Sequence, residues 1–308
     1  MKKRLMETKT KLTIIILNYN TKELLRKCLD SIRKYIDEVV LEVIVSDNAS
    51  SDGSAGMVKK KFPWVCVIEG PNNGFSKGNN RARKLARGEM VLFLNPDTVV
   101  NKGVFKKIVE YLENHKDVGA LGCKLVLPSG EIDKDGKRSF PTPWVSFTHL
   151  VLKLDRVFPK SKLFAKYWYG YLPENKLLEV DAIQGAFFLT RKKILDGVGW
   201  FDEDYFFYGE DLDLCWKIKK AGWKIVYYPK VFIYHLKGVS MGRSKLWKTK
   251  IPLKQKLEIK LATVEAMETF YKKNLWERYP LFFNLFVIFG IKLYKALRWS
   301  WAIASSII

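Results

Sequence analysis

The sequence predicts an α/β protein built on a Rossmann-like, mostly parallel sheet, and three observations support this. The apolar segments expected to be strands are continuous runs, which is typical of strands buried on both faces of a parallel sheet. Segments with helical spacing alternate with them over roughly the first hundred residues. Each strand-like run ends in a cluster of polar or turn-forming residues. We therefore expect a doubly wound sheet whose polar loops meet at the carboxyl ends of the strands, where such sheets bind ligands.

The first expected strand, residues 12–17, leads into the polar run Asn18-Tyr19-Asn20-Thr21. Asn20 is followed three residues later by Glu23, which predicts a capped helix start, and apolar residues then recur at helical spacing. The second strand, residues 39–45, stops at a run of turn formers that begins with Asp47 and Asn48.

A helix over residues 54–61 is expected to lead to a third strand at 65–68. A polar loop over 71–78 and a helix at 79–87 then return the chain to a fourth strand. That strand, residues 90–94, ends at Asn95-Pro96-Asp97, which places a carboxylate in the same crevice as Asp47.

Beyond about residue 125 the alternation loosens. The segment 140–178 is rich in aromatic and basic residues, and we expect it to form a mobile segment on the acceptor side of the site. Regular structure is expected again as strands at 180–190 and 224–228 and helices at 191–196 and 211–221.

The length and composition fit one large α/β domain with a smaller appendage. With 308 residues and 48% hydrophobic content, the chain can fill a sizeable core, which argues against disorder over most of its length. The net charge of +22 predicts an anionic partner: nucleic acid, phospholipid head groups or a phosphorylated substrate. The four cysteines are widely separated and form no CxxC pair, as is typical of reduced core cysteines. The basic N-terminus leads into an apolar run too short for a signal peptide, so we expect a cytoplasmic protein.

The strand-end loops carry no common phosphate-binding fingerprint, since neither a GxGxxG nor a Walker loop is present. Tyr19 can stack on a base, and Asp47 can accept a hydrogen bond from a base or a ribose hydroxyl. Asp97 is a candidate ligand for a divalent cation that bridges a diphosphate, because such a cation needs only one or two protein carboxylates. The alternative for each loop is a simple turn between a strand and a helix.

Six acids gather between Gly199 and Trp216 among aromatic residues, just before an expected helix. Burial there would raise carboxyl pKa values toward those suited to base catalysis, which makes Glu210 and Asp211 the catalytic candidates. The alternative is that these acids only favour the helix dipole. His235 is interpreted either as a structural histidine or as a metal ligand.

Together, the ordered motifs resemble glycosyltransferase family 2, and its rhamnosyltransferase-like branch in particular. The motifs lie at residues 17–21, 46–53, 72–80, 94–98, 184–186 and 208–216, and the resemblance covers roughly residues 11–240. It implies the GT-A fold, a nucleotide-diphospho-sugar donor, Mg²⁺ or Mn²⁺, and inversion at the anomeric carbon.

The resemblance also assigns roles by position. Asp211, with Glu210 beside it, matches the catalytic base, and Asp97 and His235 match positions that reach the metal. The first acid of the family's DxD motif is Asn95 here, and the branch's second histidine after His235 is missing, although Gly238 and Ser240 are kept. The donor positions are Asn18, Tyr19, Asn20, Asp47, Asn48, Asn73, Gly74, Lys77, Asn79, Asn95 and Asp97. The acceptor positions are Gln184, Gly185, Ala186 and Trp216.

We therefore expect an inverting, metal-dependent glycosyltransferase. The branch favours dTDP-L-rhamnose as the donor, with UDP-sugars as the alternative, and a lipid-linked or oligosaccharide acceptor. Two other classes were weighed. A nucleic-acid-binding protein would carry its basic residues on the motif loops, which are acidic or neutral here, and a nucleotide-sugar pyrophosphorylase would carry a Gly-rich basic first loop.

The expected division is a catalytic domain at residues 1–240, with a nucleotide-sugar half at about 11–100 and an acceptor half at about 101–240. Residues 241–308 form a basic, helical C-terminal region with an apolar run of eleven residues at 281–291, shorter than a membrane span. We expect this region to bind an anionic membrane at the inner face of the cell membrane without crossing it. The alternatives are a helix packed on the catalytic domain or a helix hairpin at a homo-oligomer interface.

Overall fold

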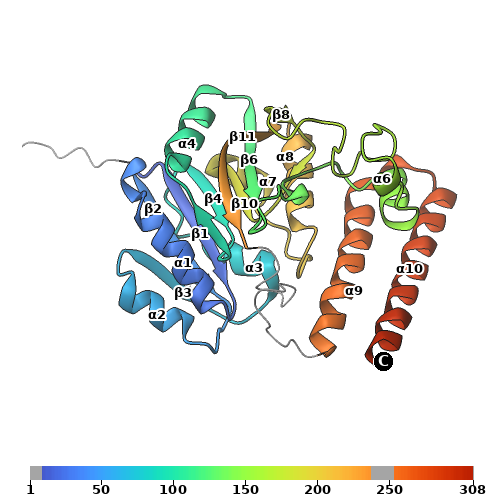
Figure 1. Cartoon of the computed structure of the whole chain (residues 1–308), viewed down its shortest axis with the longest axis horizontal. Helices are drawn as coiled ribbons and strands as arrows, with labels where there is room; N and C mark the ends of the chain where they lie inside the picture. Colours follow the sequence, from blue (N-terminus) through green and yellow to red (C-terminus); the bar gives the residue numbers. More distant parts are fainter. Residues whose placement is uncertain (1–8, 237–252, 308) are drawn as a thin grey trace, which may run out of the picture.

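The computed structural model describes residues 9–236 and 253–307, with side chains at 9–236 and 261–300. A sheet of nine strands lies at the centre, helices cover both of its faces, and two long helices stand beside it at the C-terminal end (Figure 1). Gly238, Ser240 and the basic stretch around Lys245 lie outside the described residues.

The first half of the sheet is parallel throughout, as predicted. Its strands run in the order β3-β2-β1-β4, and every neighbouring pair among them is parallel. The strands are β1 (Leu12–Asn18), β2 (Leu41–Asp47), β3 (Val65–Glu69) and β4 (Met90–Leu94), and helices α1 (Lys22–Arg33), α2 (Ser54–Lys61) and α3 (Gly74–Asn80) connect them. The carboxyl ends of β1 and β2 therefore lie side by side, with Asn18 paired to Asp47 in the register.

The second half of the sheet is mixed. Its main strands are β6 (Val118–Val126), β10 (Phe187–Arg191) and the long β11 (Lys224–His235). Strand β10 runs antiparallel between β4 and β6, while β11 is parallel to β6. Two short strands, β5 (Thr98–Val100) and β8 (Leu178–Glu179), pair with β11 antiparallel.

The single strand expected over 180–190 is divided in two. Strand β9 (Ala182–Ile183) leaves the main sheet and pairs with β7 (Lys137–Arg138), and β10 begins at Phe187. The residues between them, 184–186, are therefore free to turn toward α8 (Glu210–Lys220). The remaining helices of this half are α4 (Val104–Asn114) and α7 (Lys192–Val198).

Two predicted helix starts are wrong, and both depend on distant contacts. Asn20 does not cap α1: its φ is 52°, and the first helical amide, Lys22 N, donates instead to Asp52 Oδ2 at 2.8 Å. The helix expected at 79–87 begins at Gly74 and ends at Asn80. Gly74 has a φ of 92°, which only glycine adopts readily, and this turn lets Phe75 N donate to Phe206 O at 2.7 Å.

The core is divided by the sheet into two layers. One lies under α1, α2 and α4, where Leu25, Cys28 and Leu29 are fully buried. The other lies under α7 and α8 and is dominated by aromatic residues, including Trp200 and Phe201. The segment 140–178 crosses this side of the molecule with three short helical turns, α5 (Pro143–Ser146), η3 (Phe147–Val151) and α6 (Leu154–Val157).

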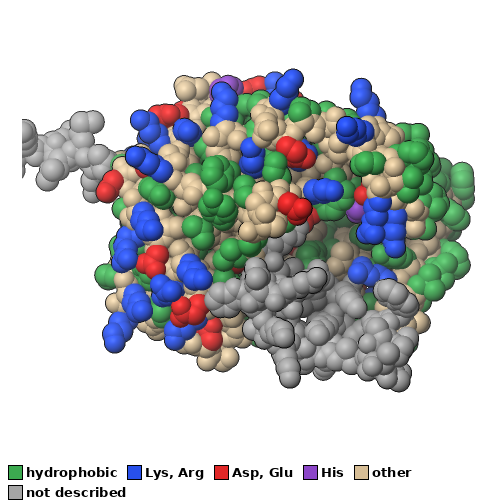
Figure 2. Space-filling view, viewed as in Figure 1, with side chains coloured by type: hydrophobic (Ala, Val, Ile, Leu, Met, Phe, Trp, Pro, Cys, Tyr) green, Lys and Arg blue, Asp and Glu red, His purple; other side chains and the backbone are tan. Residues whose placement is uncertain are grey.

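The C-terminal helices α9 (Leu253–Phe270) and α10 (Leu281–Ile307) lie side by side (Figure 1). Phe270, Tyr271 and Leu275 are buried in the aromatic core, and Tyr271 Oη donates to the buried Asn284 Oδ1 at 2.6 Å. The opposite side of α10 exposes Phe282, Phe286 and Phe289, each more than 60% accessible. Hydrophobic side chains gather at the α10 edge of the molecule in Figure 2.

None of the described helices is both long enough and apolar enough to cross a membrane.

Candidate active site

The ends of β1 and β2 form a hydrogen-bonded pair of loops. Asn18 Nδ2 donates to Asp47 Oδ2 at 2.7 Å and to Ser50 Oγ at 3.0 Å, and Ser50 N donates to Asp47 Oδ1 at 2.8 Å. Asp47 is buried, whereas the ring of Tyr19 is 42% exposed at the edge of the crevice. The carboxylate is thus held in place, and the aromatic ring is accessible to a planar ligand. Asn20 closes the loop by accepting from Ser51 N at 2.8 Å.

The loop before α3 joins this pair. Asn48 Nδ2 donates to Gly74 O at 3.1 Å, and its buried Oδ1 has no hydrogen-bond partner. Asn79 is buried and donates to Phe75 O at 3.0 Å, so its role is to hold the first turn of α3. Asn73 and Lys77 are exposed. The structure therefore brings Asn48 and Gly74 together and leaves Lys77 at the surface of α3.

The end of β4 meets the turn between β9 and β10. Asn95 N donates to Ala186 O at 3.0 Å, and the neighbouring Gly185 N donates to Asp211 Oδ2 at 3.0 Å. Gln184, at the start of this turn, has a buried Oε1 without a hydrogen-bond partner. The end of β4 and the start of α8 are thus linked through two adjacent residues, Gly185 and Ala186.

Asp97 and His235 also come together, because β5 pairs with the end of β11. His235 Nε2 lies 3.6 Å from Asp97 Oδ1, and His235 Nδ1 lies 3.1 Å from Asp133 Oδ2. Burial disfavours the imidazolium, but its interactions with the Asp133 and Asp97 carboxylates outweigh burial and raise the pKa of His235 to about 9. The histidine therefore carries a proton between two carboxylates at neutral pH.

Few protein side chains around Asp97 and His235 are placed to bind a divalent cation. Among the described residues, no group of three or more His, Cys, Asp or Glu side chains is placed to hold a metal ion. Asp97 Oδ1 is nevertheless buried and without a hydrogen-bond partner, beside an imidazole nitrogen. This donor set fits a hard cation that takes one or two protein ligands and completes its shell with phosphate and water oxygens.

Glu210 and Asp211 begin α8, and both are buried. Asp211 Oδ2 accepts from Arg138 Nη2 at 2.5 Å, and Oδ1 accepts from Leu212 N at 2.8 Å. Burial, and then the charge of Asp211, raise the pKa of Glu210 to about 8. Burial disfavours the Arg138 cation, yet the charge of Asp211 outweighs this and raises its pKa above the ordinary value. The two adjacent carboxyls are therefore unequal: among the described residues, Asp211 forms an ion pair with Arg138 and Glu210 forms none.

Sequence reasoning missed Arg138 and Asp133. Arg138 lies on the two-residue strand β7, and the only sequence signal is a basic pair in an otherwise irregular stretch. Trp216, an expected acceptor residue, is buried between Phe140 and Phe270, with ring centroids at 4.8 Å and 5.7 Å. The structure thus places its ring in the aromatic core beside the C-terminal helices.

A family model described as "Glycosyltransferase like family 2" matches residues 10–251. The N-acetylglucosaminyl-diphospho-decaprenol L-rhamnosyltransferase of Mycobacterium tuberculosis is 28% identical over 246 residues, which cover 75% of this chain and 78% of that protein. Rhamnosyltransferase WbbL of Escherichia coli K12 is 24% identical over 230 residues, covering 72% of this chain and 82% of that protein.

Two solved structures share the fold. GalNAc-T7 with UDP, GalNAc and Mn²⁺ superposes with a TM-score of 0.59 at 16% identity, covering 86% of this chain and 50% of that one. The mannosyltransferase PcManGT of Pyrobaculum calidifontis, with GDP-Man and Mn²⁺, gives a TM-score of 0.55 at 18% identity, covering 98% and 74%. At these identities the likeness concerns the fold alone.

Proposed function

The chain belongs to glycosyltransferase family 2, in its rhamnosyltransferase-like branch with the GT-A fold, and on this basis we propose that it transfers L-rhamnose from dTDP-L-rhamnose to a lipid-linked glycan. The proposed reaction inverts the anomeric carbon and depends on a divalent cation. Support for the sugar and for the acceptor comes from the relative whose name specifies L-rhamnose and a diphospho-decaprenol acceptor. A UDP-sugar is the alternative donor.

The observation that carries the proposal is the position of unpaired buried polar atoms. Buried groups without partners are uncommon in folded proteins and call for an explanation. Five such atoms lie on residues of the candidate site: Asn48 Oδ1, Asp97 Oδ1, Gln184 Oε1, Glu210 Oε2 and Arg138 Nε. They come from loops far apart in sequence, and a polar ligand in the crevice would satisfy them.

On the donor side, the exposed ring of Tyr19 stacks on the base, and Asp47 accepts from the nucleoside. Asn18 and Ser50 hold the Asp47 carboxylate in place, so little side-chain entropy is lost when the donor binds. Asn73 and Gly74, at the start of α3, line the same crevice, and Asn79 holds the first turn of that helix.

We assign the general base to Asp211. A carboxylate has about four lone-pair positions. Arg138 and Gly185 N occupy the two on Oδ2, and Leu212 N occupies one on Oδ1. The remaining lone pair of Oδ1 accepts the proton of the acceptor hydroxyl. As that proton leaves, the hydroxyl oxygen forms a bond to the anomeric carbon, and the bond between the anomeric carbon and the nucleoside diphosphate breaks. Arg138 contacts the Asp211 carboxylate, whereas Glu210, with its raised pKa, stays protonated at neutral pH.

Asp97 is the proposed carboxylate ligand of the cation, on the fit of its unpaired Oδ1, and His235 would join it once the cation replaces the proton on Nε2. When bound, Mg²⁺ or Mn²⁺ would neutralise charge on the departing diphosphate. Asp133 orients the His235 ring through the 3.1 Å contact to Nδ1, as a carboxylate often does behind a metal-binding imidazole.

We further propose that residues 1–240 form the catalytic domain and that residues 241–308 attach it to the inner face of the cell membrane. The exposed Phe282, Phe286 and Phe289 on α10 support this, because an apolar face of that kind lies in the interface of a bilayer without crossing it. The basic residues of the region favour anionic lipid.

The test is a transfer assay with the purified full-length chain, a polyprenyl-diphospho-N-acetylglucosamine acceptor in anionic vesicles, Mn²⁺ and a panel of nucleotide sugars. We expect turnover with dTDP-L-rhamnose and a fall in kcat of about 10²- to 10⁴-fold in Asp211→Asn, with donor affinity retained. Asp204→Asn is the control, since it makes the same chemical change at an exposed acid of the same segment. Turnover that survives in Asp211→Asn would remove the base assignment, and preference for a UDP-sugar would replace the proposed donor.

A further inference from the structure

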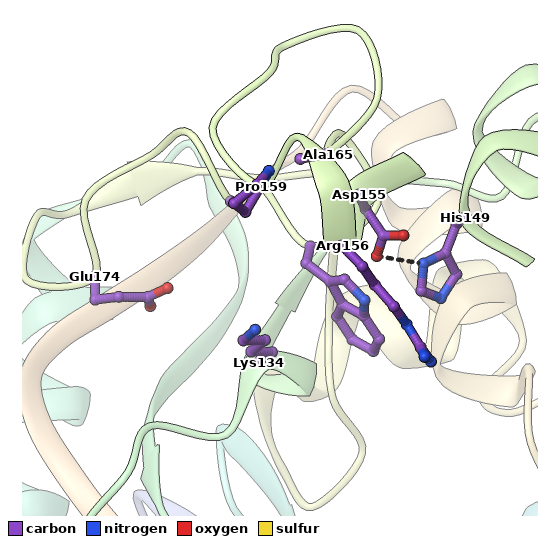
Figure 3. Close-up of a pocket in the computed structure, with 9 residues that line it drawn as sticks. Lys134, His149, Asp155, Arg156, Pro159, Ala165 and Glu174 are labelled. Atoms are coloured by element: carbon purple, nitrogen blue, oxygen red, sulfur yellow. Dashed lines mark hydrogen bonds and ion pairs between the residues drawn. The ribbon is translucent and has the colours of Figure 1, made fainter. Parts of the chain in front are cut away.

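A cavity lies under the segment 140–178, lined by residues other than those of the candidate active site. It has a volume of about 620 Å³, and Lys134, His149, Asp155, Arg156, Trp168 and Glu174 are among its lining residues. Figure 3 shows His149 and Asp155 joined on one side, with Arg156 beside them, and Lys134 and Glu174 contributed by other parts of the chain. None of these residues takes part in the donor crevice.

Each of the two carboxylates of the cavity has one cationic or imidazole partner, although Asp155 Oδ1 is buried without a hydrogen-bond partner. Asp155 Oδ2 lies 2.8 Å from His149 Nδ1, and Glu174 Oε1 lies 3.0 Å from the buried Lys137 Nζ. Lys134 and Arg156, in contrast, form no ion pair within the described part of the chain. The cavity therefore presents two unpaired cations, which favour an anionic ligand with several oxygen acceptors, such as a phosphate or diphosphate.

The cavity is physically tied to both halves of the site. Lys134 directly follows Asp133, which contacts His235, and it precedes Arg138, which contacts Asp211. Ser139 N donates to Tyr167 O at 2.9 Å, which fixes the backbone next to Trp168. Lys134 is thus close along the chain to Arg138, which contacts the proposed base.

The segment that lines the cavity also exposes apolar side chains. Leu152, Val157 and Phe158 lie close in sequence to the cavity residues Asp155, Arg156 and Pro159 and are 45%, 66% and 50% exposed. Lys153 and Lys160 lie beside them. An exposed apolar cluster edged by cations is suited to a hydrocarbon chain that carries a phosphate, and less so to free phosphate.

We propose that this cavity binds the diphosphate of a polyprenyl-linked acceptor, with Lys134 and Arg156 on the phosphate oxygens and Leu152, Val157 and Phe158 against the start of the hydrocarbon chain. The sugar next to the diphosphate then extends toward Asp211. The inference rests on the proposed function, which it deepens by placing the acceptor.

The test is titration of the full-length chain with farnesyl diphosphate, a short polyprenyl diphosphate, in metal-free buffer so that a cation does not hold the probe at Asp97. We expect saturable binding that weakens by at least about tenfold in Lys134→Gln/Arg156→Gln and is unchanged in Lys162→Gln, an exposed cation of the same segment outside the cavity. Inorganic pyrophosphate is expected to bind more weakly than farnesyl diphosphate.

Two results would overturn the proposal: equal farnesyl diphosphate affinity in the wild type and the double variant, or equal affinity for pyrophosphate and farnesyl diphosphate. Acceptor KM in the transfer assay separates this inference from the proposed function. If transfer proceeds and KM is unaffected by the double variant, the function holds and the cavity assignment is wrong. If no donor supports transfer but farnesyl diphosphate binding depends on Lys134 and Arg156, the proposed function fails and the binding site remains.

Discussion

Replacing Arg138 by methionine tests the buried ion pair between Arg138 and Asp211, the proposed general base. The Arg138 and Asp211 side chains are only 11% and 9% exposed and lie 2.5 Å apart. Methionine keeps an unbranched side chain similar to the aliphatic part of arginine. It removes the cation that contacts Asp211, which is left buried beside Glu210. Breaking a buried pair by removing one partner costs about 3–5 kcal/mol of unfolding free energy, because the remaining charge is uncompensated.

The size of that loss is expected to depend on pH. Two adjacent buried carboxyls without a cation favour the protonated form in the folded state, which raises the pKa of the pair. The stability that protonation gives is present at acid pH and is lost as pH rises through the raised pKa. Arg138→Met is therefore expected to be closer to the wild type at pH 5 than at pH 8. Its kcat should fall most at neutral pH and recover partly at alkaline pH, where the base is again ionised.

Urea unfolding at both pH values, combined with a double-mutant cycle, measures the coupling. Asp211→Asn in the Arg138→Met background should restore stability, since it removes the uncompensated charge. Arg26→Met is the control: its ion pairs with Glu23 and Asp30 are at the surface and are worth about 0–1 kcal/mol. A loss below about 1 kcal/mol for Arg138→Met, with additive effects in the double variant, would refute the reasoning.

Three further predictions concern the metal, Glu210 and α10. Asp97→Ala should abolish the Mn²⁺-dependent part of dTDP binding in titration calorimetry, and dTDP binding that is equally strong with and without Mn²⁺ in the wild type would contradict the metal role. Protonated Glu210 contributes stability that is fully present below pH 4.5 and is lost as pH rises through about 8. Glu210→Gln stays neutral at every pH, so the two proteins should be similar at pH 4.5 and the variant should become the more stable one as pH rises; parallel unfolding profiles would show that Glu210 is not held protonated. The triple variant Phe282→Ser/Phe286→Ser/Phe289→Ser should reduce co-sedimentation with anionic vesicles, whereas the control Val40→Ser, at another exposed apolar residue, should not. If the triple variant binds vesicles as well as the wild type does, this face of α10 is not the membrane-binding surface.

The strand ends of the nucleotide half were predictable because their signals are local. Continuous apolar runs followed by turn formers located Asn18, Asp47 and Asp97, and parallel pairing then brings Asn18 and Asp47 together. Asp211 was also found from a local signal, a group of acids among aromatic residues at the start of an expected helix. Their roles as donor, metal and base residues remain predictions until the assays above are done.

Features that depend on distant contacts were not predictable. Arg138 is 73 residues from Asp211 and reaches it only because β7 pairs with β9, two-residue strands too short to leave a periodic pattern. The α1 start was misassigned because its capping carboxylate, Asp52, lies 30 residues from Lys22. The cavity at Lys134 likewise forms from segments with no shared sequence motif.

The anomeric configuration of the product tests the central claim most directly. The purified chain would be incubated with dTDP-L-rhamnose, Mn²⁺ and the polyprenyl-linked acceptor, and the new glycosidic carbon examined by nuclear magnetic resonance through its one-bond carbon–proton coupling. The account predicts a rhamnosylated acceptor whose anomeric configuration is opposite to that of the donor, formed by the wild type and nearly absent with Asp211→Asn. A product that retains the donor configuration, or one formed equally well by Asp211→Asn, would contradict single displacement with Asp211 as the base.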